Sequence, residues 1–316
     1  MSIFNKDIFQ GNLNKNQYFE GWYFKNISAD LKSVYSIIAG VSLNKNDKHA
    51  FIQIINGITN KTHYIRYDIS EFYYDKKIFF ITIGNNQFSK DYIFIDIDTD
   101  DIKMKGGIDY LHSVSYPKSI RSPGIMGYFS YIPKMECNHG IVSVTNQTKG
   151  ELIVNNEKID FTNGHGYIEK DWGHSFPDAW IWLQCNTFKD FKNSLFMSIA
   201  NIPFLGFKFK GFICFIYHNG TFYNFSTYNH SKIKSMSYEN EILHITLTNS
   251  KYTVVIKASQ INGGELIAPS GGVMNRVIKE SVYSDVQYEL LNNKNILIDK
   301  QSGTCAGLEI CNFEKL

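Results

Sequence analysis

The sequence contains no uninterrupted apolar run of the roughly 18 residues that a membrane-spanning helix needs. Its first residues, MSIFNKDIFQGNLNKNQ, lack the apolar centre of a secretory signal. The five cysteines are sparse and odd in number, which argues against a disulfide framework and for reduced thiols. We therefore expect a cytoplasmic protein.

Charge and short motifs exclude several classes of protein. The 32 basic and 30 acidic side chains are scattered, with no basic block that would predict binding to nucleic acid or an anionic membrane. No GxSxG, phosphate-binding loop or GxGxxG is present, so serine hydrolases, kinases and nicotinamide dehydrogenases lack their basic parts. Cys137 and His139 are too isolated for a zinc site, and we expect no metal.

Aromatic side chains are abundant instead, at 15% of residues, and suit a pleated, half-buried surface. Short β-type runs bounded by turn signals recur along the chain, with no sustained helical period, so the predicted fold class is all-β. Asn219-Gly220 predicts a hairpin turn, and residues 139–156 predict a second hairpin that turns near Gln147–Gly150. The only expected helical turn lies between Pro117 and Glu136.

The length of 316 residues fits two β domains. No linker rich in Pro, Gly or Ser divides the chain, and the best boundary is the polar stretch at 163–178. We predict an N-terminal domain over residues 1–165 and a C-terminal domain over residues 166–316. Two antiparallel barrels would accommodate the strands and protect their edges.

The four tryptophans lie in two segments, YFEGWYFK (18–25) and GYIEKDWGHSFPDAWIWLQ (166–184). If residues 179–188 form a strand, one face combines indoles with amides, as the lining of a ligand cavity does. This face carries Trp180, Trp182, Gln184, Asn186 and Phe188. The opposite face is typical of a packed core and carries Ile181, Leu183, Cys185 and Thr187. The alternative for the first face is an aromatic core with hydrogen-bonded amides.

Three carboxylates, Glu20, Glu169 and Asp171, lie in the same segments. Burial against indole rings would raise the pKa of a carboxyl group and make it a general acid. The alternative is that Glu20 or Glu169 forms a structural ion pair with Lys25 or Lys170. His165 and His174 flank the acidic residues, although a lone histidine is more often structural or exposed than catalytic.

Five segments together resemble the tocopherol cyclase family, in the order of that family and over nearly the whole chain. They are YFEGWYFK, SPGIMGYFSYIPKMECNHGIVS (122–143), GYIEKDWGHSFPDAWIWLQCN (166–186), GGELIAPSGGVMNR (263–276) and SGTCAGLEI (302–310). The resemblance implies two lipocalin-like antiparallel β-barrel domains packed together, similar to carotenoid hydratases and certain fungal cyclases. It also implies a reaction without a cofactor, in which a prenylated hydroquinone closes to a chromanol.

Such a ring closure needs an acid that protonates an alkene, aromatic faces that stabilise the cation, and a base for the phenolic proton. On this resemblance Asp171 is the expected proton donor, with Glu169 and Glu20 as rivals, and His165 or His174 takes the phenolic proton. The expected substrate-binding residues are Trp22, Tyr23, Trp172, Trp180, Trp182 and Gln184.

Two other functions stay open from the sequence. One is a hydro-lyase resembling the carotenoid hydratases, and the other is a non-catalytic carrier of an apolar prenyl or fatty-acid-like ligand. We expect an apolar small-molecule ligand, no nucleic acid, and at most weak peripheral contact with a membrane, since no amphipathic anchor helix is visible. The sequence leaves the oligomeric state open.

Overall fold

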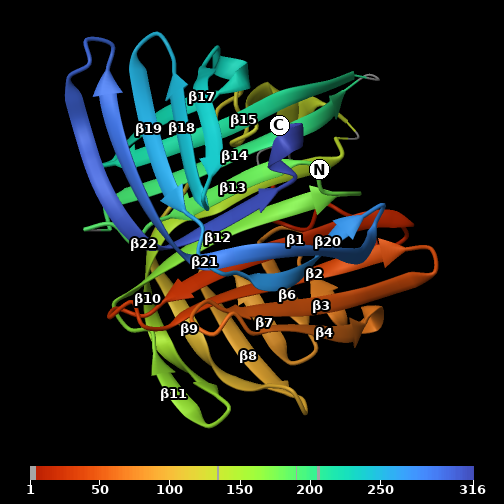
Figure 1. Ribbon diagram of the computed structural model, residues 1–316. Coiled ribbons are helices and arrows are strands. Elements are labelled where there is room, and N and C mark those ends of the chain that lie inside the picture. The colour runs from red at the N-terminus through yellow and green to blue at the C-terminus, as the bar shows by residue number, and fades with distance from the viewer. Residues whose placement is uncertain (1–4, 134, 190, 205–206) are drawn as a thin grey trace. The chain divides into compact units, whose positions relative to one another are not determined.

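The computed structural model describes residues 5–133, 135–189, 191–204 and 207–316 (Figure 1). Across these residues it contains 22 strands and four short 3-10 helices, and no α-helix. This confirms the predicted all-β fold. No helix among the described residues is long and apolar enough to cross a membrane.

The contacts divide the chain into two compact units. Unit 1 comprises residues 1–176 and 265–278, and unit 2 comprises residues 177–264 and 279–316. The predicted boundary after residue 165 falls inside the strand β12 (Gly164–Gly173), whereas the division by contacts falls between Phe176 and Pro177. We call residues 265–278 the arm, because they belong to unit 1 although the chain on both sides of them belongs to unit 2.

Unit 1 is built on one antiparallel sheet with the strand order β4-β3-β2-β1-β12-β10-β9-β8-β7-β6-β5, and β11 pairs with β10. The edge strands β4 and β5 are joined by the short helix η1, so the sheet curls into a nearly closed, lipocalin-like barrel. The bounds are β1 Gln17–Ile27, β2 Val34–Asn44, β3 Asp47–Asn56, β4 Thr62–Asp68, η1 Ile69–Glu71, β5 Phe72–Tyr74, β6 Phe80–Ile83, β7 Asn86–Ser89, β8 Tyr92–Asp98, β9 Lys103–Val114, η2 Gly127–Tyr131, β10 Cys137–Val154, β11 Glu157–Asp160 and β12 Gly164–Gly173.

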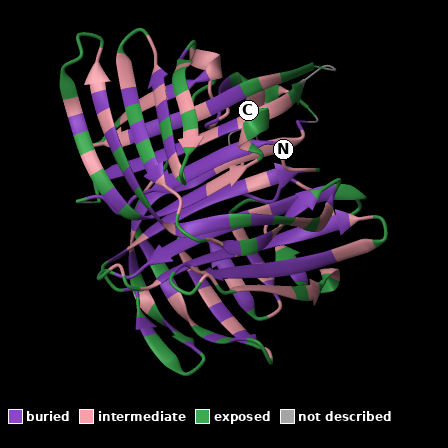
Figure 2. Ribbon diagram, in the orientation of Figure 1, coloured by how far each residue is buried: buried purple, intermediate pink, exposed green. Residues whose placement is uncertain are grey.

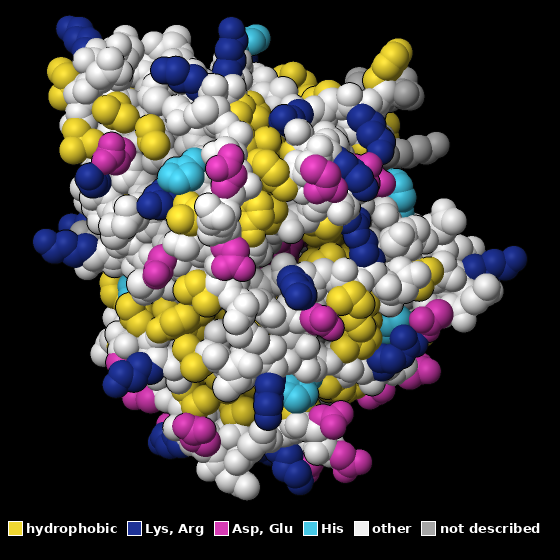
Figure 3. Space-filling model, viewed as in Figure 1, with side chains coloured by type: hydrophobic (Ala, Val, Ile, Leu, Met, Phe, Trp, Pro, Cys, Tyr) yellow, Lys and Arg dark blue, Asp and Glu magenta, His cyan; other side chains and the backbone are white. Residues whose placement is uncertain are grey.

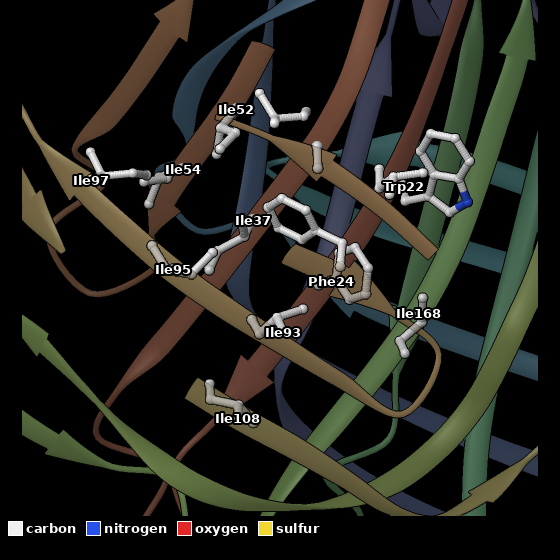
Figure 4. Packing of buried hydrophobic residues seen from close by; sticks show 14 of the residues in the cluster. Trp22, Phe24, Ile37, Ile52, Ile54, Ile93, Ile95, Ile97, Ile108 and Ile168 are labelled. Carbon is white, nitrogen blue, oxygen red and sulfur yellow. The ribbon is translucent and has the colours of Figure 1, made fainter. Parts of the chain in front are cut away.

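The interior of this barrel is filled by side chains. Trp22 and Phe24 lie among isoleucines from β2, β3, β8 and β9 (Figure 4), and the ring of Trp22 stacks on Phe79 at 5.5 Å between centroids. Figure 2 shows how continuously the strands around β1 and β12 are buried. Full burial of each such apolar side chain stabilises the fold by roughly 1.5–3 kcal/mol.

Unit 2 is a second antiparallel sheet with the order β16-β15-β14-β13-β22-β21-β19-β18-β17. Its edge strands β16 and β17 are joined by η3, and a second apolar cluster fills it. The bounds are β13 Trp180–Cys185, β14 Asn193–Phe204, β15 Phe207–His218, β16 Thr221–Ser226, η3 Thr227–Asn229, β17 Lys232–Glu239, β18 Ile242–Thr248, β19 Tyr252–Ser259, β20 Gly264–Ser270, β21 Val273–Asn292, β22 Leu297–Cys311 and η4 Phe313–Lys315. β20 pairs with β21, and most of β20 and the first residues of β21 form the arm, which belongs to unit 1. The predicted lipocalin-like fold of two β domains is thus confirmed.

The two predicted hairpins had different outcomes. β15 ends at His218 and β16 begins at Thr221, and Asn219 and Gly220 have φ angles of 47° and 83°, so the first hairpin is confirmed. The second is wrong, because β10 runs unbroken through Gln147–Gly150 and turns only after Val154. Polar residues there are held between strands, as where Thr148 Oγ1 donates to the Phe161 carbonyl at 2.6 Å, so their polarity did not mark a turn. The expected helical turn between Pro117 and Glu136 is η2.

The arm lies against strands β2 and β3 of unit 1. Gln53 makes two hydrogen bonds to Ile267, donating to its carbonyl and accepting from its amide, each at 2.9 Å. The hydroxyl of Ser42 donates to the carbonyl of Gly272 at 3.1 Å. Unit 1 therefore includes a segment from late in the chain.

Candidate active site

Strand β12 carries the segment YIEKDW and separates its side chains onto two faces. Ile168 and Trp172 belong to the core cluster of unit 1, and Lys170 faces the same way. Because side chains alternate along a strand, Tyr167, Glu169 and Asp171 face away from that core. β12 lies between β1 and β10, so both neighbours supply partners to each face.

On the core side, Glu20 and Lys170 form a buried ion pair with 2.5 Å between Oε1 and Nζ. Both side chains are at most 1% exposed. The Glu20 carboxylate also accepts the backbone amide of Gln10 at 2.8 Å and the hydroxyl of Tyr18. The structure therefore realises one of the sequence alternatives for Glu20, an ion pair with Lys170, and leaves this carboxylate fully occupied.

The Lys170 ammonium also binds the N-terminal segment through hydrogen bonds. It donates to the carbonyl oxygens of Lys6 at 2.8 Å and Ile8 at 2.5 Å. It lies 4.7 Å from the ring of Trp22 and 4.9 Å from that of Trp172, within cation–π range. Burial lowers the pKa of Lys170, and the Glu20 carboxylate opposes that effect. The sequence predicts Trp22 and Trp172 as substrate-binding residues. In the structure both belong to the core of unit 1 and lie beside the Lys170 ammonium.

On the other face, three titratable side chains converge; we call His139, Glu169 and Asp171 the proton cluster. His139 Nδ1 lies 2.7 Å from Asp171 Oδ1, and His139 Nε2 lies 3.5 Å from Glu169 Oε2. The register makes this possible, because His139 on β10 is opposite Asp171 and Ile141 is opposite Glu169. The side chains of Glu169, His139 and Asp171 are 5%, 12% and 24% exposed, so Asp171 is the most accessible.

The imidazole of His139 is poised to be protonated. Burial alone would lower its pKa, but the two carboxylates and the hydrogen bond to Asp171 raise the pKa of His139 to about 9. One histidine thus lies between two carboxylates, with a hydrogen bond to Asp171 and an ion-pair contact to Glu169.

A tyrosine holds the buried end of the proton cluster. Tyr167 is fully buried and its hydroxyl donates to Glu169 Oε2 at 2.5 Å. Burial, and then the Glu169 carboxylate, raise the pKa of Tyr167, so this phenol keeps its proton. Tyr23, opposite Glu169 in the register, shares a 2.8 Å hydrogen bond with Ser36. Two phenol rings therefore flank the carboxylate.

The distances within the proton cluster fit a proton better than a metal. The three side chains could each offer one ligand atom, all within 4.8 Å of one another. However, two ligands about 2.1 Å from a tetrahedral zinc ion stand roughly 3.4 Å apart. The 2.7 Å between His139 and Asp171 is the length of a charge-assisted hydrogen bond. The absence of a metal stays a prediction of the sequence.

The two histidines that the sequence proposed lie elsewhere. His165 is on the same face of β12 as Asp171 but six positions along the strand, about 20 Å away at the usual rise. His174 follows the end of β12, and its side chain is exposed. Of the catalytic residues predicted, the structure brings together Glu169 and Asp171, and it places Glu20 on the opposite face.

The remaining predicted binding residues lie on β13 in unit 2. Ile181, Leu183 and Cys185 belong to the core of unit 2, as predicted for that face. Trp180, Trp182 and Gln184 are buried but face away from that core. The indole of Trp180 donates to Glu309 at 2.6 Å. Their contact with a substrate stays a prediction.

Residues 110–312 match the sequence profile of the family described as tocopherol cyclase-like. The chain belongs to this family. It is 23% identical over 186 residues to the chloroplastic tocopherol cyclase of Zea mays, covering 53% of this chain and 36% of that protein. It thus spans little more than a third of the length of the curated relatives it matches.

Solved structures with this fold include CghA bound to Sch210972, with a TM-score of 0.58, 7% identity, and coverage of 93% of this chain and 89% of that one. Kievitone hydratase from Nectria haematococca has a TM-score of 0.52 and 11% identity, and the coverage is 97% and 94%. At these identities the likeness establishes the fold.

The residue that sequence reasoning missed is His139. The sequence suggests His139 only as a zinc ligand together with Cys137, and these two residues are too isolated for such a site. The signal was present, because His139 lies in the block FSYIPKMECNHG, which carries part of the family resemblance.

Proposed function

We propose that this protein is a tocopherol cyclase-like isomerase that closes the ring of a prenylated hydroquinone, with the proton cluster as its acid and base. The observation that supports this most directly is the pair of contacts from His139 to Asp171 and Glu169. Ring closure by isomerisation needs a donor and an acceptor of protons close together, and this cluster supplies both.

The reaction balances without an oxidant or a co-substrate. Asp171 delivers the proton that His139 holds against it to one alkene carbon, which leaves a tertiary cation on the other. The phenolic oxygen attacks that cation, a C–O bond forms, and the phenolic proton passes to Glu169. Glu169 then passes that proton to His139 Nε2, which restores the imidazolium beside Asp171 for the next turnover.

The assignment of Asp171 as donor and Glu169 as acceptor rests on their surroundings. Asp171 is the more exposed of the two, as a group that meets the substrate should be. Glu169 is held by Tyr167 at the buried end. Phenol faces such as those of Tyr23 and Tyr167 stabilise a nearby cation by about 0.5–2 kcal/mol when water is excluded.

The test is turnover of a prenylated hydroquinone in D2O. The product should be an isomer that carries one deuterium on carbon, detected by mass spectrometry. Asp171→Asn should lower the rate by about 10²–10⁴-fold, the usual contribution of a general acid, while its circular dichroism stays that of the wild type. Asp109→Asn, an exposed carboxylate on β9 outside the proton cluster, is the matched control and should retain full activity.

The same experiment separates the alternatives. A product heavier by one water would indicate a hydro-lyase instead of a cyclase. Binding of the hydroquinone without any product would indicate a carrier. Unchanged turnover in Asp171→Asn would remove Asp171 from the mechanism and leave Glu169 to be tested in the same way.

A further inference from the structure

The hairpin of β14 and β15 extends beyond the rest of the sheet in unit 2. These two strands pair with each other as far as Phe204 and Phe207. The neighbour β13 pairs with β14 only as far as Ala200, and β16 pairs with β15 only as far as Ile213. The described residues 201–204 and 207–210 therefore form a two-stranded ribbon, which we call the finger and with which no third described strand pairs. At its base, Asn201 donates to the carbonyl oxygens of Ala179 at 3.1 Å and Lys315 at 2.5 Å.

The finger has an apolar end, which is exposed at Phe207. Phe207 is 80% exposed, more than any other large hydrophobic side chain that the structure describes. Behind it, Ile202 and Phe209 are opposite each other and both approach Gly211, where a Cβ would lie 2.3 Å from Ile202 and 3.2 Å from Phe209. In Figure 3, hydrophobic side chains project from the surface at the upper right. Beyond this closely packed base, Phe207 presents an aromatic ring to solvent.

In the sequence, the finger lies within a segment whose Lys, Arg, Asp and Glu residues are all lysines. Residues 191–238, which include β14 to β16 and β17 as far as Tyr238, contain five lysines and no Asp or Glu, whereas the rest of the chain carries a small net negative charge. Lys208 and Lys210 are exposed and alternate with the two phenylalanines along β15. Lys208 also pairs with Asp178 at 2.6 Å. The apolar end is therefore followed at once by ammonium groups.

We propose that the finger docks on an anionic phospholipid bilayer, with Phe207 inserted among the acyl chains and Lys210 at the level of the phosphates. A bilayer accepts a narrow apolar tip, whereas a stable protein partner usually needs about 800 Å² on each side. Lysines beside inserted aromatic rings are the usual arrangement at a membrane surface, because the aliphatic stem is apolar and the ammonium contacts the headgroups. This docking is independent of the proposed reaction and is measured without a substrate.

The test is co-sedimentation of the whole protein with vesicles of phosphatidylcholine, with and without phosphatidylglycerol. The wild type should bind, more tightly when phosphatidylglycerol is present. Phe207→Ser should lower partitioning about tenfold or more on both kinds of vesicle, as expected for loss of a buried phenyl ring, whereas Phe207→Leu should retain most of it. Lys210→Gln should remove part of the gain from phosphatidylglycerol and weaken its dependence on salt.

Two variants in the same unit serve as controls. Ile296 is 58% exposed in the turn before β22, and Lys251 is exposed in the turn before β19. Ile296→Ser and Lys251→Gln should bind vesicles as the wild type does, and thermal unfolding should show that all the variants are folded. A wild type that stays in solution with both kinds of vesicle would overturn the proposal. So would a Phe207→Ser variant that binds as tightly as the wild type, or a loss of binding in Ile296→Ser of the same size.

Discussion

At the scale of single residues, the chemistry depends on which side chains of β12 face the same way. The sequence indicated the three carboxylates and an ion pair as one of their alternatives, and Glu20 with Lys170 is that pair. It could not indicate that His139 would lie at Asp171. That contact joins strands about thirty positions apart in the chain, and register shifts in β10 between Ile141 and Asn146 help to set their pairing. Local spacing carries no information about such a register.

The raised pKa of His139 should be visible in the stability of the fold. The folded-state pKa of about 9 is above the ordinary value of 6.5, so protonated His139 stabilises the fold below pH 6.5. This contribution, roughly 3 kcal/mol at most, is lost as the pH rises from 6.5 through 9. The free energies of unfolding of the wild type and of His139→Gln, measured with denaturant, should therefore become more alike as the pH rises from 6.5 to 9. A difference that stays constant from pH 6 to pH 10 would contradict the assignment.

The ion pair of Glu20 and Lys170 should behave as a unit. Lys170→Met leaves the Glu20 carboxylate buried without its cation, and we expect a loss of about 3–5 kcal/mol in the free energy of unfolding. Glu20→Gln combined with Lys170→Met removes both charges and should recover a large part of that loss. A double-mutant cycle measured by urea denaturation gives the coupling, and strictly additive effects would show that the two groups do not depend on each other.

At the scale of elements, the sequence predicts strands and turns well where apolar and polar residues alternate. It predicts them less well where a strand is polar. The hairpin at Asn219-Gly220 is confirmed because positive φ angles demand those residue types. The prediction divided β10 wrongly in two, because Asn146 and Thr148 are buried beside β12, which lies outside the segment that the prediction used. Polarity marks a turn only when no other strand satisfies the polar groups.

The contact between the arm and the rest of unit 1 can be weakened by adding one methyl group. Gly272 has a φ of 79°, and a Cβ there would lie 2.6 Å from the backbone of Gln17 and Tyr18. Gly272→Ala should therefore loosen the arm, and amide hydrogen exchange should speed up in residues 265–278 while β18 and β19 keep the protection of the wild type. Gly220→Ala also has a positive φ but meets nothing within 4 Å, and it should leave the arm unchanged.

At the scale of the whole molecule, the all-β class, the lipocalin-like fold and the family were predictable, because they rest on patterns repeated along hundreds of residues. The overall charge balance describes the chain only on average and does not predict the charge of a particular segment. A chain with 32 basic and 30 acidic side chains still contains the acid-free stretch at 191–238, and the overall count concealed it. The assignment of residues 265–278 to unit 1 has no local signal in the sequence, since it is a property of tertiary contacts.

The discontinuity of unit 1 predicts how fragments behave. A fragment of residues 1–176 lacks the hydrogen bonds that Gln53 and Ser42 make to the arm. Joining residues 265–278 to this fragment through a flexible Gly/Ser linker should raise its thermal unfolding midpoint by several degrees, as expected from about 1–3 kcal/mol of restored contacts. A joined peptide of the same composition in scrambled order is the control. Equal midpoints for the two fusions would show that the arm adds nothing to unit 1.

The arm also affects how the protein folds during its synthesis on the ribosome. When residue 176 leaves the exit tunnel, the first barrel has all its strands, but the segment that lies against β2 and β3 has not yet been synthesised. At about 5–20 residues per second, residues 177–278 take roughly 5–20 s more to appear. During that time the nascent barrel exposes the surface that the arm later covers. A chaperone that binds exposed sheet surface therefore has a window to act, and translation itself sets the length of that window.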